Sequence, residues 1–169
     1  EPVPENFLPR PLRIVAAGDS LTQGVGDSTG SGGYLPYLEK QLMKKGIREV
    51  SIENFGVKGH RTDQLLRRLG EEEVRSAVEN ADMVTVTIGG NDMMKIIRQN
   101  IFDLKMELFE EEKAAYASRI AGMMERIHSI NPEAAVVLIG FYNPFYSWFS
   151  NIAEMNQIVE EWNRMSQEI

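Results

Sequence analysis

Short apolar segments alternate with longer amphipathic segments along this chain of 169 residues. Residues 12–17, 50–55, 83–88 and 134–141 are short segments that are predicted to be strands, and the length and β-branched content of the first suit a buried strand better than a helix. Helical segments separate these strands, so we expect a parallel sheet with right-handed crossovers and helices on both faces. The pattern therefore predicts an α/β fold, a three-layer α/β/α sandwich with a central parallel sheet.

The helices are predicted from apolar residues that recur every three or four positions. They are expected over residues 34–46, from Thr62 or Asp63 onward, over about 94–106 and 110–130, and from about 152 to the end. The last pattern is expected to lead into a further strand, but the sequence stops at Ile169. We therefore expect one domain, residues 12–169, that is truncated and lacks its C-terminal strand.

The first eleven residues contain four prolines, at positions 2, 4, 9 and 11. Proline has no backbone N–H, so residues 1–11 are predicted to form an extended tether outside the core. The chain begins at Glu1 instead of methionine, which favours removal of an upstream leader or anchor. An extracytoplasmic location is therefore preferred.

The composition excludes several classes of function. The 18 basic and 25 acidic residues give a net charge of −7, which disfavours nucleic acid as a partner. The chain has no cysteine, so disulfides, thiol nucleophiles and thiolate metal sites are excluded. No apolar run reaches the roughly 20 residues that a membrane span requires. The sequence does not determine the oligomeric state.

Candidate catalytic residues follow the first three predicted strands. These positions hold Gly18-Asp19-Ser20, Gly56 and Gly89-Gly90-Asn91-Asp92. The carboxyl ends of parallel strands share one edge of the sheet, so we expect the three segments to meet. A serine at a sharp turn after a strand presents its hydroxyl as a nucleophile, and its own N–H can bind an oxyanion. The Gly56 N–H and the uncharged Asn91 amide are predicted to supply two further donors.

Three blocks of the sequence resemble those of a known enzyme family. Residues 17–24 (AGDSLTQG), 54–59 (NFGVKG) and 89–92 (GGND) match, in order and spacing, the first three blocks of the SGNH hydrolases, the GDSL-type lipase and acylhydrolase family. The resemblance implies a flavodoxin-like SGNH hydrolase fold from about residue 12, with Ser20 as the nucleophile. It also implies an oxyanion hole formed by the Ser20 N–H, Gly56 and Asn91.

The last block of that family, Asp-x-x-His near the C-terminus, is absent from this chain. His60 and His128 are the only histidines, and neither has an aspartate three residues before it. If the family pattern holds, the general base and its carboxylate lie beyond Ile169. His60 follows the second strand and is the alternative base, although its basic neighbours favour a solvated loop. His128 is predicted to be a partly buried helix residue without a catalytic role.

Each site residue also has a purely structural interpretation. Ser20 is alternatively a helix N-cap, and Gly56 and Asn91 are alternatively residues that end a strand or form a turn. Asp19 and Asp92 are expected to hold their loops through hydrogen bonds to the backbone rather than to contact substrate. The three blocks in register favour the catalytic interpretation for the first three residues.

Two further segments lie near the predicted catalytic edge. The glycine-rich residues 24–33 lack the spacing of a nucleotide-binding loop, and we expect them to give the chain freedom to pass over this edge. The aromatic residues between 141 and 149 are expected either to pack in the core or to line an acyl pocket.

The predicted function is a serine ester hydrolase that cleaves a small-molecule ester through an acyl-enzyme at Ser20, without a metal or organic cofactor. The sequence does not choose among a lysophospholipid, a short acyl ester and an O-acetylated sugar. One alternative is a non-catalytic sugar- or acyl-binding α/β module, which the absent Asp-x-x-His block favours. Another is a receiver-type signalling domain, but Asp19 alone does not make the acidic cluster that such a domain carries.

Overall fold

The structure is a computed structural model that describes residues 11–100, 102–143 and 153–169. Most of the predicted tether and the aromatic residues 144–149 lie outside the described residues. The strands are β1 (Leu12–Gly18), β2 (Val50–Gly56), β3 (Met83–Thr87) and β4 (Ala135–Ile139). The helices are α1 (Ser20–Gln23), α2 (Leu35–Lys44), α3 (Thr62–Arg68), α4 (Glu72–Glu79), α5 (Gly90–Gln99), α6 (Glu107–Ile130) and α7 (Ala153–Glu168).

The strands form one parallel sheet in the order β2-β1-β3-β4, as the sequence predicts. Strand β1 pairs with β2 on one side and with β3 on the other. The register places Gly18, the last residue of β1, opposite both Gly56 and Thr87. The three strands therefore end level with one another, and the segments that follow them start from one edge of the sheet.

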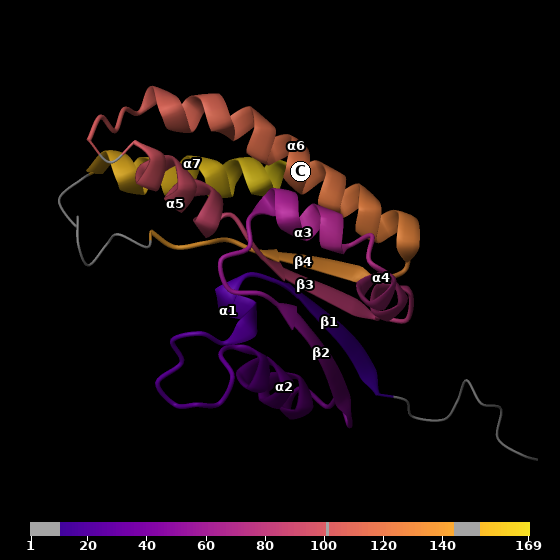
Figure 1. The fold of residues 1–169 in the computed structure, drawn as a ribbon. Helices are drawn as coiled ribbons and strands as arrows, with labels where there is room; N and C mark the ends of the chain where they lie inside the picture. Colours follow the sequence, from indigo (N-terminus) through magenta and orange to yellow (C-terminus); the bar gives the residue numbers. More distant parts are fainter. Residues whose placement is uncertain (1–10, 101, 144–152) are drawn as a thin grey trace, which may run out of the picture.

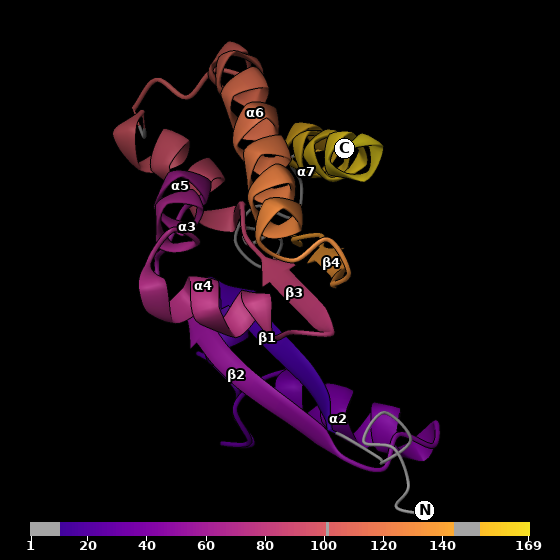
Figure 2. The ribbon, with the colours of Figure 1, turned by 90° about the vertical axis from the view of Figure 1, so that its right-hand side faces the viewer.

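Helices cover both faces of the sheet, which confirms the predicted three-layer arrangement (Figures 1 and 2). Helices α3 to α7 form one layer, above the sheet in Figure 1, and α1 and α2 lie on the opposite side against β1 and β2. From β1 the chain moves outward to β2 and then back across β1 to β3 and β4. Right-handed crossovers in these two directions place the connecting helices on opposite faces.

The main core lies between the sheet and the layer of α3 to α7. Alternate residues of β1 and β3 face it, and helices contribute large side chains that are almost fully buried. These residues include Val15, Ala17, Val84, Val86, Leu65, Leu69, Phe109, Tyr116, Ile120, Met123, Ile127 and Trp162. Burial of each large apolar side chain stabilises the fold by about 1.5 to 3 kcal/mol, so this layer holds the sheet edge in place.

Helix α5 begins and ends earlier than the sequence predicts, over Gly90–Gln99 rather than about 94–106. A short helix α1 also follows Asp19, where the sequence analysis assigned no element. Met93 and Ile96 are buried in the core and anchor the first turns of α5, which overrides the poor helix propensity of the preceding glycines. The N-terminus of α5 therefore lies directly beside the catalytic edge.

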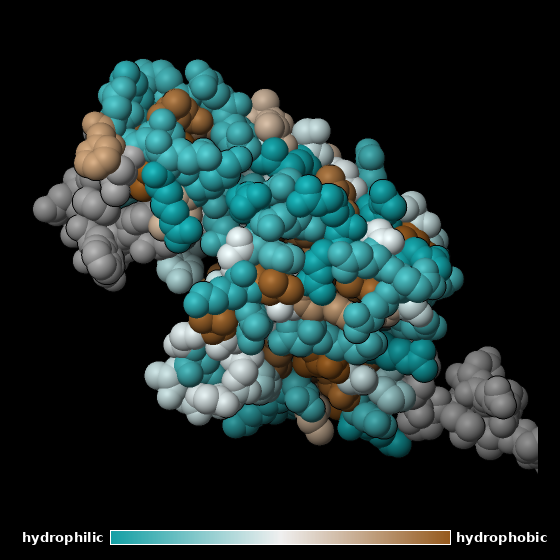
Figure 3. Space-filling view, viewed as in Figure 1, coloured by the Kyte–Doolittle hydropathy of each residue, from teal (hydrophilic) through white to brown (hydrophobic). Residues whose placement is uncertain are grey.

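The outward side of the helical layer is largely hydrophilic, and apolar side chains on that face occur singly or in small groups (Figure 3). This distribution is typical of amphipathic helices that turn one face to a core. Among the residues that the structure describes, no helix combines the length and the apolar character needed to span a membrane.

Candidate active site

Ser20 is the first residue of α1 and lies directly after the turn that ends β1. Asp19, not Ser20, is the N-cap of this helix, because its carboxylate accepts the N–H of Leu21 at 2.9 Å. Only glycine fits at position 18 of this turn, because a Cβ there would lie 2.4 Å from the carbonyl oxygen of Thr87. The missing side chain lets the Ser20 turn pack against the end of β3.

A buried polar cluster fixes this turn to β3. The Thr87 hydroxyl donates to Asp19 Oδ1 at 3.1 Å and lies 2.7 Å from the Thr22 hydroxyl, and all three residues are buried. Burial raises the pKa of the Asp19 carboxyl, while the N–H of Leu21 and the Thr87 hydroxyl oppose that shift. The predicted loop-holding role of Asp19 is confirmed by these contacts.

Ser20 and Asn91 line the same small cavity, of about 100 Å³. The full lining consists of Asp19, Ser20, Leu21, Gly90, Asn91, Met94, Phe141 and Tyr142. Neither the hydroxyl nor the N–H of Ser20 has a hydrogen-bond partner among residues 11–100, 102–143 and 153–169. Both groups of this half-buried serine are therefore available to a molecule in the cavity.

The side-chain amide of Asn91 is held from the neighbouring loop. Its Nδ2 donates to the carbonyl oxygen of His60 at 2.9 Å. A primary amide carries two N–H bonds, so one fixes the side chain and the second stays free to donate. The Asn91 side chain is thus held at the cavity that Ser20 also lines, with one N–H that has no partner among the described residues.

The structure does not bring Gly56 to this cavity as a donor. Its N–H donates to Asn54 Oδ1 at 2.8 Å, and Gly56 does not line the cavity. A Cβ at position 56 would lie 2.2 Å from the backbone nitrogen of Gln23. Glycine is therefore needed here so that α1 can approach β2, which is a packing role rather than the predicted oxyanion contact.

Gly59, which the sequence analysis did not single out, also lies outside the cavity lining, but its N–H is unpaired where that of Gly56 is not. The N–H groups of residues 56, 57, 58 and 60 bond to Asn54 Oδ1, Gly18 O, Gln23 Oε1 and Val57 O, respectively. Within the described part of the chain, the N–H of Gly59 has no acceptor. Its φ of +82° is one that glycine adopts without strain. Sequence alone does not reveal this positive φ, so nothing in the sequence distinguished Gly59 from Gly56.

The loop that carries Gly59 is joined to α5 by buried hydrogen bonds. Asp92 accepts the N–H of Thr62 at 3.0 Å and also the Thr62 hydroxyl, and both residues are buried. Arg119 of α6 donates to the same hydroxyl at 2.6 Å and lies 3.4 Å from Asp92 Oδ1. Burial raises the pKa of Asp92, whereas the Thr62 hydrogen bonds and the Arg119 charge lower it. The expected structural role of Asp92 is confirmed.

Neither histidine contacts Ser20 in the part of the chain that the structure describes. His60 and His128 are absent from the cavity lining, and His128 is exposed on α6 rather than partly buried as predicted. The buried side of this helix runs through Ile120, Met123 and Ile127, and His128 lies one residue beyond it. Burial and the nearby Arg68 charge lower the pKa of His60.

The glycine-rich residues 24–33 form an ordered turn rather than a freely moving loop. The Asp27 carboxylate accepts the N–H groups of Thr29, Ser31, Gly32 and Gly33 at 2.9 to 3.1 Å. The Thr29 hydroxyl, followed by the N–H groups of Gly33, Thr29 and Gly32, lowers the pKa of Asp27. These bonds restrict the loop against the expected conformational freedom, because one carboxylate accepts four of its backbone donors.

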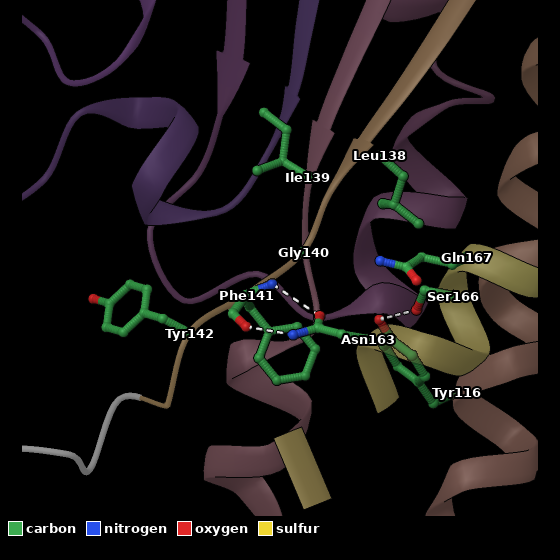
Figure 4. Close-up of a pocket in the computed structure, with 9 residues that line it drawn as sticks. All are labelled: Tyr116, Leu138, Ile139, Gly140, Phe141, Tyr142, Asn163, Ser166 and Gln167. Atoms are coloured by element: carbon green, nitrogen blue, oxygen red, sulfur yellow. Dashed lines mark hydrogen bonds between the residues drawn. The ribbon is translucent and has the colours of Figure 1, made fainter. Parts of the chain in front are cut away.

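A larger cavity, of about 520 Å³, lies between β4 and α7 (Figure 4). Its lining includes Leu138, Ile139, Tyr116 and Ser166, and Phe141 and Tyr142 belong to both cavities. The outer edge of β4 pairs with no other strand among the described residues. The Ser20 cavity and the cavity beside β4 therefore meet at residues 141–142.

A parallel α/β sheet with a serine after its first strand and a Gly-Gly-Asn-Asp turn after its third has the architecture of the SGNH hydrolases. The model of the GDSL-like lipase/acylhydrolase family matches residues 16–169, and the chain belongs to this family. The resemblance of the three sequence blocks is thereby confirmed at the level of the family.

Two curated relatives come from bacilli. Protein YpmR of Bacillus subtilis is 38% identical over 154 residues, which make up 91% of this chain and 60% of that protein. The spore germination lipase LipC of Bacillus licheniformis is 31% identical over 140 residues, or 80% of this chain and 66% of that lipase. The chain thus spans less than two thirds of the length of either relative.

Solved structures share the fold. The lipase Lip_vut3 from a goat rumen metagenome superimposes with a TM-score of 0.83 at 28% identity, covering 94% of this chain and 75% of that one. The SGNH-hydrolase family esterase AlinE4 gives a TM-score of 0.61 at 23% identity, covering 95% of this chain and 75% of that one, and shows the fold alone. The family and its neighbours are lipases and esterases, which supports a hydrolase.

Proposed function

We propose that this protein is a serine ester hydrolase in which Ser20 forms the acyl-enzyme. The Ser20 oxygen attacks the ester carbonyl carbon, its proton passes to a base, and the alcohol leaves with a proton. Water then cleaves the acyl-serine ester and releases the carboxylic acid. The observation that carries the proposal is the cavity that Ser20 and Asn91 both line, because the Ser20 hydroxyl, the Ser20 N–H and the second N–H of the Asn91 amide have no partner among the described residues.

The negative charge on the carbonyl oxygen is proposed to be stabilised by three neutral donors. They are the N–H of Ser20, the second N–H of the Asn91 amide and the N–H of Gly59. Gly56 can serve only if its bond to Asn54 breaks, so Gly59 replaces it in the proposal. Loss of one such donor typically raises the barrier by about 3 kcal/mol.

The general base is proposed to come from a segment outside these 169 residues. No histidine of the described chain lines the Ser20 cavity, whereas the free edge of β4 lies next to it. A strand that paired with this edge would carry its following loop to the catalytic side of the sheet, as β1 and β3 do. The Asp-x-x-His pair that the family resemblance implies is proposed to lie there.

The substrate is proposed to be a small-molecule carboxylic ester. The lipase names of LipC and Lip_vut3 support an acyl ester over a phosphate ester or amide. Phe141 and Tyr142 line the cavity and provide apolar surface for an acyl group. A short acyl ester fits a cavity of about 100 Å³ better than the bulk of a lysophospholipid.

Covalent labelling of Ser20 tests the proposal. The protein, with any residues that its gene encodes beyond Ile169, is treated with a fluorophosphonate probe and assayed with p-nitrophenyl acetate. We expect labelling and turnover in the wild type, and a loss of about a thousandfold or more in Ser20→Ala. Ser28→Ala, which removes an exposed serine of the glycine-rich turn, is the matched control and should behave as the wild type.

One observation favours a second candidate, a non-catalytic module that binds a sugar or an acyl group. The Ser20 hydroxyl has no basic partner in the described part of the chain. The same experiment separates the two candidates. If the protein with its complete C-terminus shows neither Ser20-dependent labelling nor turnover, the hydrolase is excluded and the binding module is favoured.

A further inference from the structure

Residues 141–143 cross from the end of β4 to the Ser20 cavity, and α7 holds them on one side. The Phe141 N–H donates to Asn163 Oδ1 at 3.1 Å, and Asn163 Nδ2 donates to the Phe141 carbonyl at 2.7 Å. Asn143 Nδ2 donates to Asn156 Oδ1 at 2.7 Å. Asn156 and Asn163 are two helical turns apart, so both belong to one face of α7.

This arrangement leaves Tyr142 as the residue that faces away from α7. Phe141 is 6% exposed and Asn143 is 9% exposed, whereas Tyr142 between them is 66% exposed. In an extended segment, successive side chains point to opposite sides. Figure 4 shows the Tyr142 ring turned away from Asn163, and Tyr142 lines the cavity that contains Ser20.

Close packing prevents the backbone at Phe141 from moving. The Phe141 ring packs so tightly on Gly89 that a Cβ there would lie 2.8 Å from it, and it meets Tyr116 and Trp162 edge to face. The Asn163 amide fits only because residue 140 is glycine, where a Cβ would lie 2.9 Å from its Oδ1. The two Asn163 hydrogen bonds fix the peptide groups on both sides of Phe141 and thus the direction in which the chain enters Tyr142.

We propose that the Tyr142 ring sets the size of the acyl group that the Ser20 cavity accepts, and that Asn163 positions this ring. The inference rests on the proposed ester hydrolysis at Ser20. The ring forms one wall of a cavity of about 100 Å³, so short acyl groups fit and longer ones meet the ring. Tyr142 is 66% exposed and also lines the cavity, as expected of an amphipathic side chain at the mouth of a site.

The preference for acyl length in Tyr142 variants tests the inference. The protein with any residues encoded beyond Ile169 is assayed with p-nitrophenyl acetate and octanoate, and kcat/KM for octanoate is divided by kcat/KM for acetate. We expect Tyr142→Ala to raise this ratio about tenfold, because a few methylene groups in an apolar pocket discriminate by that order. Tyr142→Phe retains the ring and should retain the wild-type ratio.

The controls separate this inference from the proposed function. Tyr37→Ala removes a tyrosine that is 55% exposed on α2 and does not line the cavity, and it should leave the ratio unchanged. An unchanged or lowered ratio in Tyr142→Ala overturns the inference while Ser20-dependent hydrolysis stands. The absence of Ser20-dependent hydrolysis of any ester overturns both proposals.

The positioning role of Asn163 has its own readout. Asn163→Ala should raise the octanoate-to-acetate ratio in the wild-type background and should not raise it further in the Tyr142→Ala background. A merely structural Asn163 would lower kcat/KM for both esters together and leave the ratio unchanged. Asn163→Asp, which keeps the acceptor for the Phe141 N–H, is measured in parallel in case the alanine variant does not fold.

Discussion

Two glycines three positions apart show how the role of a residue depends on its backbone bonds. Gly56 ends β2, and its N–H is used by Asn54, while its missing side chain makes room for α1. Gly59 lies in the following turn, in open space, with an N–H that no described residue accepts. In the proposed mechanism the oxyanion donor is therefore the second glycine, although both residues have the same side chain.

His60 supplies a test at the level of one side chain. Its folded-state pKa lies below the ordinary 6.5 because of burial first and the Arg68 charge second. The unfolded chain therefore binds a proton near pH 6.5 while the folded chain does not, so the fold loses stability as the pH falls through that value.

Urea unfolding at several pH values between about 7.5 and 5.5 measures this effect. We expect the free energy of unfolding to fall less steeply with decreasing pH in His60→Gln than in the wild type. Asp19 and Asp92, whose pKa values folding also shifts, are present in both proteins. The difference between the two pH dependences therefore isolates His60. If the free energy of unfolding fell equally steeply in both proteins, the pKa of His60 would not be lowered by folding, which would contradict the burial described here.

Three elements assemble the site, and each is attached to its neighbour by buried polar contacts. Helix α1 is joined to β3 through Asp19 and Thr87, and the loop before α3 is joined to α5 through Thr62 and Asp92. Arg119 of the long helix α6 extends the second contact into the core layer. The strand ends are thus aligned by the sheet and then fixed by side chains.

Thr62 tests whether the contact between the α3 loop and α5 serves catalysis. In Thr62→Val, Asp92 loses a donor and Arg119 loses an acceptor at a fully buried position. An unsatisfied buried group costs about 1 to 3 kcal/mol, so we expect that loss in the free energy of unfolding. We also expect kcat to fall while KM changes little, since the Asn91 and Gly59 donors are displaced.

Thr62→Ser, which keeps the hydroxyl, should recover both kcat and stability. The account of this contact would be wrong if the valine variant lost stability but kept its kcat, because the hydrogen bonds would then hold the fold without positioning the donors.

At the scale of the whole molecule, the sheet could be predicted well from the sequence. The two central strands combine β-branched residues with burial on both faces, as in Val84 and Thr85 of β3, and this pattern is typical of a parallel sheet. The strand ends then placed Ser20 and Asn91 at one edge. The start of α5 was not predicted because Met93 and Ile96, through core packing, hold a helix over residues with poor propensity.

The rest of the site depends on contacts between distant parts of the chain. Asn54 accepts the Gly56 N–H, and His128 is exposed on its helix. Both outcomes depend on side-chain directions that the periodicity of apolar residues does not resolve. The pairing of Asn163 with the Phe141 backbone joins residues 22 positions apart through an irregular segment. Such contacts have no local sequence signature, so they are found only in the structure.

The most direct test of the central claim is a crystal structure of the protein, with any residues that follow Ile169, after reaction with a fluorophosphonate. We predict a phosphonyl group on the Ser20 oxygen, with its free oxygen about 2.7 to 3.1 Å from the Ser20 nitrogen, Asn91 Nδ2 and the Gly59 nitrogen. An adduct on another residue, or a phosphonyl oxygen on Ser20 that points away from Asn91 and Gly59, would contradict the account.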